Sequence, residues 1–412
     1  MKKILALTAL AAVSSAAFAQ SSVTAYGILD AGVSQVTGLR GGTRTFLVSG
    51  IMDGSRLGFR GNEDLGGGYR ALFTMEHRME VDSGGISNRP FSGGQLPDRL
   101  VSATQLGLPS VFQPVVTAAA AGLGNTVGVN LAGNIWDRQV YVGLVTPFGA
   151  ALAGRQYTPA YEVAASFDTL GTQSSLAAGQ VAAFPPSIDI RVSNAVAYRI
   201  AQGPFSAALM YGLGEGSAST GRLIGGMAMY KADAYGAGLG YNTRENELGQ
   251  KSLTSFVVGG YFAIGPGSLY GQYAKVDDDH PSGLSALQAS LAANPQVGAA
   301  NAAIVTGAFS NGLRQDSQLM HVGYKMVTGP HTVYVAYTAL NDKRPQNADV
   351  ASYGVAYTFS FSKRTDVNAV LTHFDNKNLA QAAPGQAGFI GGVTDKAGTD
   401  SNSVALGLRH RF

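Results

Sequence analysis

Several residue types are scarce or missing in this 412-residue sequence. It has no cysteine, one tryptophan and only 13% charged residues, about half the charged share of a typical soluble domain. Without cysteine, a disulfide-stapled scaffold is excluded. Beyond the N-terminus no segment offers the roughly 18 consecutive apolar residues of a membrane-spanning helix. The six histidines show no metal-ligand spacing, so neither a metal site nor a cofactor is predicted.

Residues 1–19 are typical of a cleavable export signal. Lys2 and Lys3 precede a short apolar run, and Ala17 and Ala19 form a small-x-small cleavage site, so we expect domain 20–412 to be the mature protein. A membrane anchor is the alternative, but the run is shorter than the ~20 residues a spanning helix needs. Removing the two lysines leaves 27 basic against 26 acidic residues and lowers the net charge from +3 to +1, too little to indicate nucleic-acid binding.

The C-terminal segment alternates apolar and polar residues. One face carries Val404, Leu406, Leu408, His410 and Phe412, and the other carries Ala405, Gly407, Arg409 and Arg411. Period-2 alternation predicts a strand with one apolar and one wet face. Its recurrence between turn residues, behind an export signal, predicts a closed barrel with lipid outside and water inside.

Sixteen segments have strand character, which predicts an all-β fold, a 16-stranded antiparallel transmembrane barrel. The segments are 22–35, 51–63, 68–81, 135–146, 150–156, 190–202, 204–214, 222–232, 234–243, 252–264, 268–278, 316–328, 331–341, 349–362, 364–375 and 401–412. Tight turns such as Gly265–Gly267 alternate with long loops near 82–134, 157–189, 279–315 and 376–400. Short turns at one end and long loops at the other are typical of outer-membrane barrels. Segment 135–146 fits poorly, because Val140, Val142 and Leu144 share a side with Arg138, so either something apolar lies inside or the register is wrong.

Candidate pore residues are arginines near strand ends and acids in the loop 157–189. Selectivity in channels comes from rings of charge at the narrowest point. The candidate basic residues are Arg56, Arg138, Arg155 and Arg191, and the candidate acidic residues are Glu162, Asp168 and Asp189. If the loop folds into the lumen, its acids would face the arginines and form a constriction with a transverse field. The alternative is that all these charges are scattered over wall and loop.

Four stretches resemble the general trimeric porins of Gram-negative bacteria, especially the beta-proteobacterial type. They are SVTAYGILDAGV from Ser22, SRLGFRGNEDLGGGYRALFTMEH from Ser55, the stretch from Trp136 to Glu162, and RVSNAVAYRI from Arg191. The terminal Phe412 also matches.

The resemblance implies an outer-membrane homotrimer for passive diffusion of small hydrophilic solutes and ions. It also implies that the third outer loop, 157–189, folds inward as the constriction, with the four arginines as its basic cluster. Phe412 would serve as a recognition signal for the barrel-assembly machinery, and lipid and lipopolysaccharide would surround the barrel. Because four arginines outweigh the loop acids, we expect weak anion preference.

Alternatives remain open from the sequence alone. A substrate-specific channel is the main one. A barrel enzyme would need a nucleophile or activated water beside histidine and a carboxylate, and neither His77 nor His321 has such a motif. A surface adhesin or receptor could coexist with a pore.

The second long loop, 82–134, departs from the family because it is longer and more apolar than expected, so it could alter subunit contacts, or its apolar stretch 110–134 could enter the vestibule. Loop 279–315 is similarly rich in small apolar residues, and Leu284–Ala293 within it could form a short helix. Asp277–Asp279 could bind a divalent cation or be a solvated loop.

Overall fold

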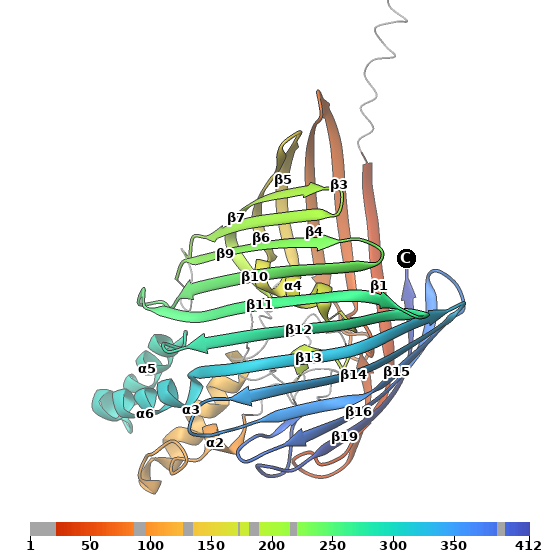
Figure 1. Ribbon diagram of the computed structural model, residues 1–412. Coiled ribbons are helices and arrows are strands. Elements are labelled where there is room, and N and C mark those ends of the chain that lie inside the picture. The colour runs from red at the N-terminus through yellow and green to blue at the C-terminus, as the bar shows by residue number, and fades with distance from the viewer. Residues whose placement is uncertain are drawn as a thin grey trace, which may run out of the picture.

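A computed structural model describes residues 22–85, 96–126, 135–171, 174–180, 189–214, 221–384 and 392–412. The predicted export signal, 1–19, lies outside these residues. Nearly all strands join one antiparallel sheet that closes on itself where β1 pairs with β19, Ile28 opposite Arg411 (Figure 1). The sheet holds seventeen strands, but β2 and β3 occupy successive halves of one position, so the barrel has sixteen. The predicted fold class is confirmed.

The strands and their bounds follow the chain. They are β1 (Ser22–Val36), β2 (Arg44–Ser49), β3 (Arg56–Gly66), β4 (Tyr69–Arg78), β5 (Gln139–Thr146), β6 (Gly149–Tyr157), β7 (Arg191–Gln202), β8 (Phe205–Gly212), β9 (Leu223–Lys231), β10 (Tyr235–Glu245), β11 (Lys251–Ile264), β12 (Gly267–Asp278), β13 (Gln315–Thr328), β14 (His331–Asp342), β15 (Val350–Ser360), β16 (Thr365–Asn376) and β19 (Ser401–Arg411), with β17 (Ala382–Ala383) and β18 (Gly392–Val393) forming a separate two-stranded sheet in the last long loop.

The second strand position is interrupted, which corrects the predicted strand 51–63. The buried carboxylate of Asp30 on β1 accepts the N–H groups of Ile51, Met52 and Asp53 at 2.9, 2.8 and 2.7 Å. These donors are therefore not available to a strand ladder, and the chain bends between β2 and β3. A carboxylate that accepts three backbone N–H groups holds such a bend firmly.

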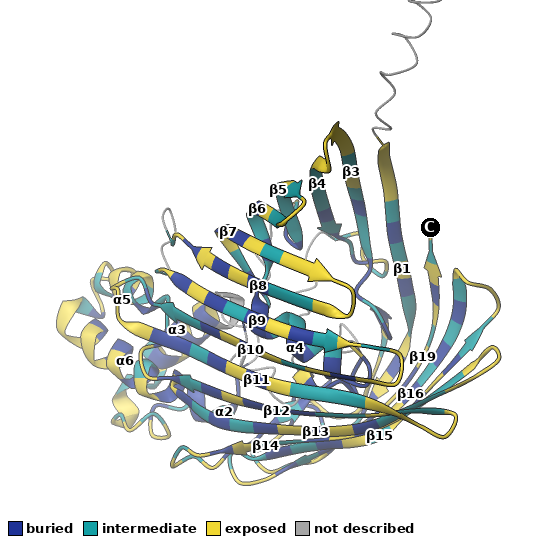
Figure 2. Cartoon of the chain, turned by 45° about the horizontal axis from the view of Figure 1, so that its top comes forward, coloured by how far each residue is buried: buried dark blue, intermediate teal, exposed yellow. Residues whose placement is uncertain are grey.

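Strand residues alternate between an exposed and a buried face, as Figure 2 shows by colour. On β19, Leu406 and Leu408 are exposed while Ala405 and Arg409 are buried, as the alternation predicts. The poor fit at 135–146 was an error of register. Arg138 precedes β5 and is buried, whereas Val142 and Leu144 within the strand are exposed on the outer face.

The connections separate by length as predicted. Glycines with positive φ, such as Gly203 (φ 57°) and Gly265 (φ 58°), form tight turns at one barrel end, where φ > 0 favours glycine. The long loops at the other end contain the helices α2 (Asp98–Val101), η2 (Ser110–Phe112), α3 (Gln113–Thr126), α4 (Pro159–Phe167), η3 (Ala178–Gln180), α5 (Leu284–Ala292) and α6 (Gly298–Leu313).

Two loop inserts, 96–126 between β4 and β5 and 279–313 between β12 and β13, pack on each other and form a helical cap, defined here as α2, η2, α3, α5 and α6. They lie together at the loop end of the barrel (Figure 1), and their shared core includes Leu100, Val116, Leu291 and Phe309. The predicted helix at Leu284–Ala293 is confirmed as α5, and α3 overlaps the insert 110–134, of which 127–134 lies outside the described residues. In the parts of the chain that can be described, no helix is long and apolar enough to cross a membrane.

Asp98 fastens the cap to two other loops. Its carboxylate pairs with Arg40 at 2.5 Å and accepts from Gln381 at 3.1 Å. On α2 the buried Arg99 donates to the carbonyl of Gly312 at 2.8 Å. The insert from the β4–β5 loop is thereby tied to loops from three other parts of the rim, and its helices pack on each other instead of extending into solvent.

Candidate pore constriction

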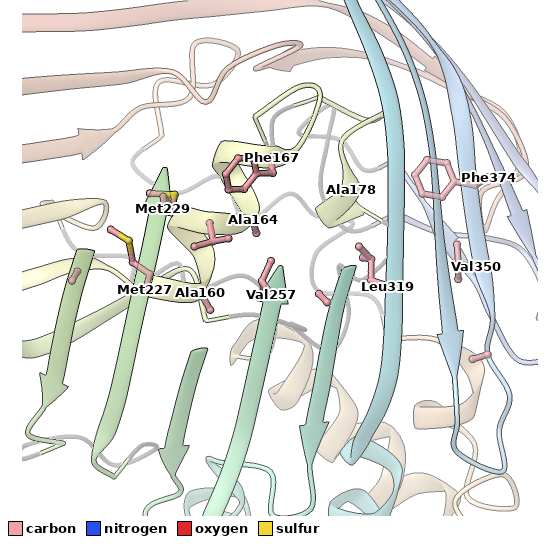
Figure 3. Close-up of a cluster of buried hydrophobic side chains, with 14 of the residues drawn as sticks. Ala160, Ala164, Phe167, Ala178, Met227, Met229, Val257, Leu319, Val350 and Phe374 are labelled. Atoms are coloured by element: carbon pink, nitrogen blue, oxygen red, sulfur yellow. The ribbon is translucent and has the colours of Figure 1, made fainter. Parts of the chain in front are cut away.

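The predicted constriction loop leaves β6 through a capped helix. Thr158 Oγ1 accepts from the N–H of Tyr161 at 3.4 Å, and Pro159 follows as the first residue of α4, so the helix begins at a well-formed N-terminus. Asp168 ends it. The helix contacts β8 through β12 from inside the barrel. Figure 3 shows its side chains pointing toward Met227, Met229 and Val257 of the wall.

Glycines in the wall make room for this helix. A Cβ on Gly238 or Gly259 would lie 2.8 or 2.7 Å from Phe167, and one on Gly240 would lie 2.9 Å from Ala160. The wall is therefore hollowed where α4 lies, and the fully buried Phe167 fills that hollow. Packing of this closeness places the helix against one side of the lumen.

Beyond α4 the loop continues around the inner wall. Thr169 contacts His321 on β13, and Ser175 Oγ lies 2.8 Å from Thr372 Oγ1 on β16. Leu170 and Leu176 join a buried cluster with residues of β2, β14, β15, β16 and β19. Within the described parts of the chain, neither cluster that includes the loop contains a residue of β3, β4, β5 or β6. The loop therefore lies along most of the wall and faces the remainder.

That remaining wall carries the predicted arginines. Arg138 is buried, with its Nε 2.5 Å from Glu76 Oε1, and Arg56 pairs with Asp53 at 3.0 Å. The charges of Arg138, Arg56 and Arg191 all act on the Glu76 carboxylate. The structure thus brings these three predicted residues into one electrostatic neighbourhood.

Arg155 and an arginine that we did not predict complete the group. Arg155 donates to the Asp137 carbonyl at 2.7 Å and to Ser193 Oγ at 2.9 Å. Arg78 pairs with the buried Asp137 at 3.1 Å. The like charges of Arg138 and Arg191 repel its guanidinium, so all three belong to the same electrostatic neighbourhood. The sequence held a signal for Arg78, because it follows Glu76 by two residues and so shares its face on β4. We call Arg56, Arg78, Arg138, Arg155 and Arg191 the arginine wall.

Two of the predicted loop acids form ion pairs with arginines outside the arginine wall. Glu162 on α4 pairs with Arg199 of β7 at 2.8 Å, and Asp189 pairs with Arg244 of β10 at 3.0 Å. Asp168 is buried within its own loop, where it accepts the N–H groups of Leu170 and Ala178, each at 2.8 Å. Its position fits a structural role, because both oxygens hold the backbone.

A second charged group on the inner face connects to the arginine wall. Asp53, the partner of Arg56, also pairs with Arg409 at 2.6 Å and with Arg411 at 3.6 Å. Asp366 of β16 pairs with the same two arginines at 3.0 and 2.8 Å. Arg409 and Arg411 lie on the wet face of the C-terminal alternation, so sequence patterning placed them correctly without assigning them to the site.

The terminal residue closes the barrel seam. Phe412 and Gly27 exchange two backbone hydrogen bonds of 3.1 Å, and a Cβ on Gly27 would lie 2.4 Å from the Phe412 ring. Phe412 is 45% exposed, on the outer face. Its predicted role as an assembly signal stays a prediction.

Potential metal ligands do not form a cluster within the described segments. In the described segments no three histidines, aspartates or glutamates are grouped so that they could hold an ion. At Asp277–Asp279, where a divalent site and a solvated loop were the two alternatives, Asp277 pairs with Lys275 at 3.2 Å and Asp278 accepts from Ser252 at 3.1 Å.

Comparison with known proteins adds to this geometry. A family model described as Gram-negative porin matches residues 6–379. The chain is 27% identical over 432 residues to outer membrane porin protein 32 of Delftia acidovorans, and 23% identical to an outer membrane porin protein of Bordetella pertussis, with 100% of both chains covered in each case. Among solved structures it resembles the anion-selective porin from Comamonas acidovorans, with TM-score 0.67, 22% identity, and 95% and 100% of the two chains covered. OmpT of Vibrio cholerae in a trimer form matches with TM-score 0.59, 14% identity, and 95% and 99% covered.

Proposed function

The chain belongs to the Gram-negative porin family and is an outer-membrane porin, and from that premise we propose a water-filled general diffusion channel that favours small anions. Solutes would pass down their own gradients, so the channel needs neither a cofactor nor catalysis, and we infer that it is not an enzyme. The observation that carries the proposal is the arginine wall facing a loop that lines the opposite side of the lumen.

Charge supports the anion preference. The arginine wall brings five guanidiniums together, and the three carboxylates of Asp53, Glu76 and Asp137 pair with members of it. The loop acids Glu162 and Asp189 are bound by other arginines. The local potential in the lumen would therefore be positive, and a water-filled passage with positive charges on low-dielectric walls concentrates anions. A relative of known structure carries the description anion-selective.

We also propose that three copies assemble. Exposed aromatic residues at the loop end of the outer face form a belt from β8 to β15, which includes Tyr211, Tyr241, Phe256, Tyr337 and Tyr353. Such belts mark the lipid headgroup level. At comparable height, β19, β1 and β2 instead present Val404, Val33 and Leu47.

An aliphatic sector of this kind suits contact with another copy. The trimer form of a structural neighbour supports the number three. Outside the subunit contacts, the belt would meet lipid and lipopolysaccharide, and Phe412 would be read by the assembly machinery.

Single-channel recording in a planar bilayer across a KCl gradient tests the proposal. We expect conductance in steps of three and a reversal potential that favours chloride. Arg56→Gln and Arg191→Gln should each shift that potential toward the cation value, whereas Arg314→Gln, on an exposed loop, should leave it unchanged. Unchanged selectivity in both wall variants would refute the assigned constriction. Saturable block by one class of solute would instead indicate a substrate-specific channel.

A further inference from the structure

Tyr157, at the end of β6, lies where the arginine wall meets the constriction loop. Its hydroxyl oxygen accepts from Arg138 Nη2 at 2.9 Å and from Arg191 Nη2 at 3.0 Å. Two guanidiniums, which repel each other, thus converge on a single neutral atom. Sequence analysis did not single out this tyrosine, because only the fold brings to it Arg138, which precedes β5, and Arg191, which begins β7.

The hydroxyl has one hydrogen left after these contacts. A phenol oxygen offers two lone pairs and one O–H donor, and the two arginines occupy the lone pairs. The Glu76 carboxylate, whose charge acts on Tyr157, is held by other groups, since Arg138 Nε donates to Oε1 and Tyr26 donates to Oε2 at 3.2 Å. Among the residues that the structure describes, none accepts a hydrogen bond from Tyr157. Three donors, two of them charged, therefore meet at this point.

The ring of Tyr157 is held on both sides. The Arg191 guanidinium lies 4.6 Å from the ring centroid, a cation–π distance. Tyr161 of α4 stacks against the ring at 5.2 Å with an interplanar angle of 21°. The position of the hydroxyl is therefore fixed jointly by the wall and by the constriction helix, and little reorganisation is needed when a solute arrives.

We propose that Tyr157 is a specificity-determining residue of the channel. It holds Arg138 and Arg191 together and presents its own O–H beside them as a third donor to a passing anion. The ligand class is a small oxyanion or halide, for which phosphate and chloride serve as probes. This inference rests on the proposed anion-favouring pore and deepens it, since a neutral residue then sets part of the selectivity.

Tyr157→Phe is the direct test, because it removes only the oxygen and keeps the ring, the stack on Tyr161 and the cation–π contact. We expect the anion-to-cation permeability ratio to fall by about two- to tenfold, the effect of one hydrogen bond. Block of the chloride current by phosphate should weaken by a similar factor. Conductance in concentrated salt should stay near that of the wild type, since the volume of the side chain is almost unchanged.

Tyr353→Phe, which removes an exposed hydroxyl on the outer face, is the matched control and should change none of these readings. If Tyr157→Phe does not assemble, Tyr157→His at pH 8 is the second variant. A neutral imidazole can accept from one arginine only, so an intermediate permeability ratio is expected.

The outcomes separate this inference from the function on which it rests. A wild-type channel without anion preference refutes the proposed function. A wild-type channel that prefers anions, together with an assembled Tyr157→Phe channel of the same ratio and the same phosphate block, overturns the role of Tyr157 alone.

Discussion

The backbone N–H of Thr169 donates a hydrogen bond to Nε2 of His321 across 3.1 Å, so the imidazole acts as an acceptor that fastens the loop after α4 to β13. Because Nε2 accepts, the ring hydrogen is on Nδ1, and Thr338 Oγ1, 2.8 Å away, accepts the hydrogen bond from it. The imidazole is therefore the neutral tautomer with its hydrogen on Nδ1. The side chain of Thr169 fills the space beside Gly323, where a Cβ would lie 2.2 Å from its hydroxyl. The loop is thus held at a point diagonal to the arginine wall.

His321→Phe should loosen this attachment. Phenylalanine keeps a ring of similar size but leaves the buried N–H of Thr169 without its acceptor, at a cost of about 1–3 kcal/mol. We expect a lower free energy of unfolding and more current noise in the open channel. His331→Phe, a matched change at an exposed position, should alter neither. Quiet currents and unchanged stability in His321→Phe would show that the loop does not depend on this contact.

Asp53→Asn should strengthen anion preference. The carboxylate of Asp53 is shared by Arg56, Arg409 and Arg411, and asparagine has similar shape without the charge. One unit of charge about 7 Å from the ion path in water changes the local anion concentration by about two- to threefold. The reversal potential in a KCl gradient measures this change. Asp64→Asn, at an exposed position near the end of β3, is the control, and a shift toward cations in Asp53→Asn would contradict the prediction.

Glu80 should make stability depend on pH. It lies in the loop after β4, and burial raises the pKa of its carboxyl to about 7 against the opposing effect of Arg78. Because the folded pKa lies above the unfolded one, the favourable contribution is complete below about pH 4.5 and is lost as the pH rises through 7. The loss is about 3 kcal/mol at most.

Glu80→Gln should remove this dependence. Urea unfolding of the wild type and the variant at pH 5 and pH 8 gives the comparison, and only the difference between the two proteins reports on Glu80. We expect the variant to lose less stability than the wild type between these pH values. An equal loss of unfolding free energy in both proteins would show that ionisation of Glu80 does not destabilise the folded state.

Phe309→Ala should unfold the helical cap and leave the barrel intact. Phe309 is fully buried where the two inserts meet, and removing a buried phenylalanine costs about 3–5 kcal/mol. Limited proteolysis should then cut both inserts, in 96–126 and in 284–313, while the barrel resists. Val111→Ala, at a position that is 77% exposed, should give the wild-type pattern. Cleavage of one insert alone would contradict a shared core.

The barrel could be predicted from the sequence because its strands obey a local rule. Alternation over ten residues is enough to identify a strand, and segment 316–328 differs from β13 by one residue. The rule failed where a distant residue intervened. Asp30 bends the chain at 51–53, and Glu76 draws Arg138 out of the alternation of β5. The residues next to 51–53 and to Arg138 in the sequence give no indication that Asp30 and Glu76 are their partners.

The charges of the candidate constriction were likewise predictable only where a local pattern places them. The arginine wall was found largely by motif, yet the pairing of Glu162 with Arg199 and of Asp189 with Arg244 depends on which strands the loop crosses. Tyr157 was missed for a related reason, since a tyrosine in a strand carries no sign of the two guanidiniums that reach it. Composition indicated two unusual inserts but could not show that they pack on each other.

That packing has a consequence for the order in which the protein folds. The two inserts leave the barrel between β4 and β5 and between β12 and β13, on opposite sides of the ring, and Arg99 meets Gly312 across 213 residues of chain. Closing so long a segment is unfavourable and slow while the chain is free. Once the sheet has closed, the strand ends from which both inserts leave are at a fixed separation. Most of the chain entropy that is lost in bringing the inserts together has then already been lost. The cap therefore forms late in folding, after the barrel has closed. The time at which its amides become protected from hydrogen exchange would then mark the completion of the barrel.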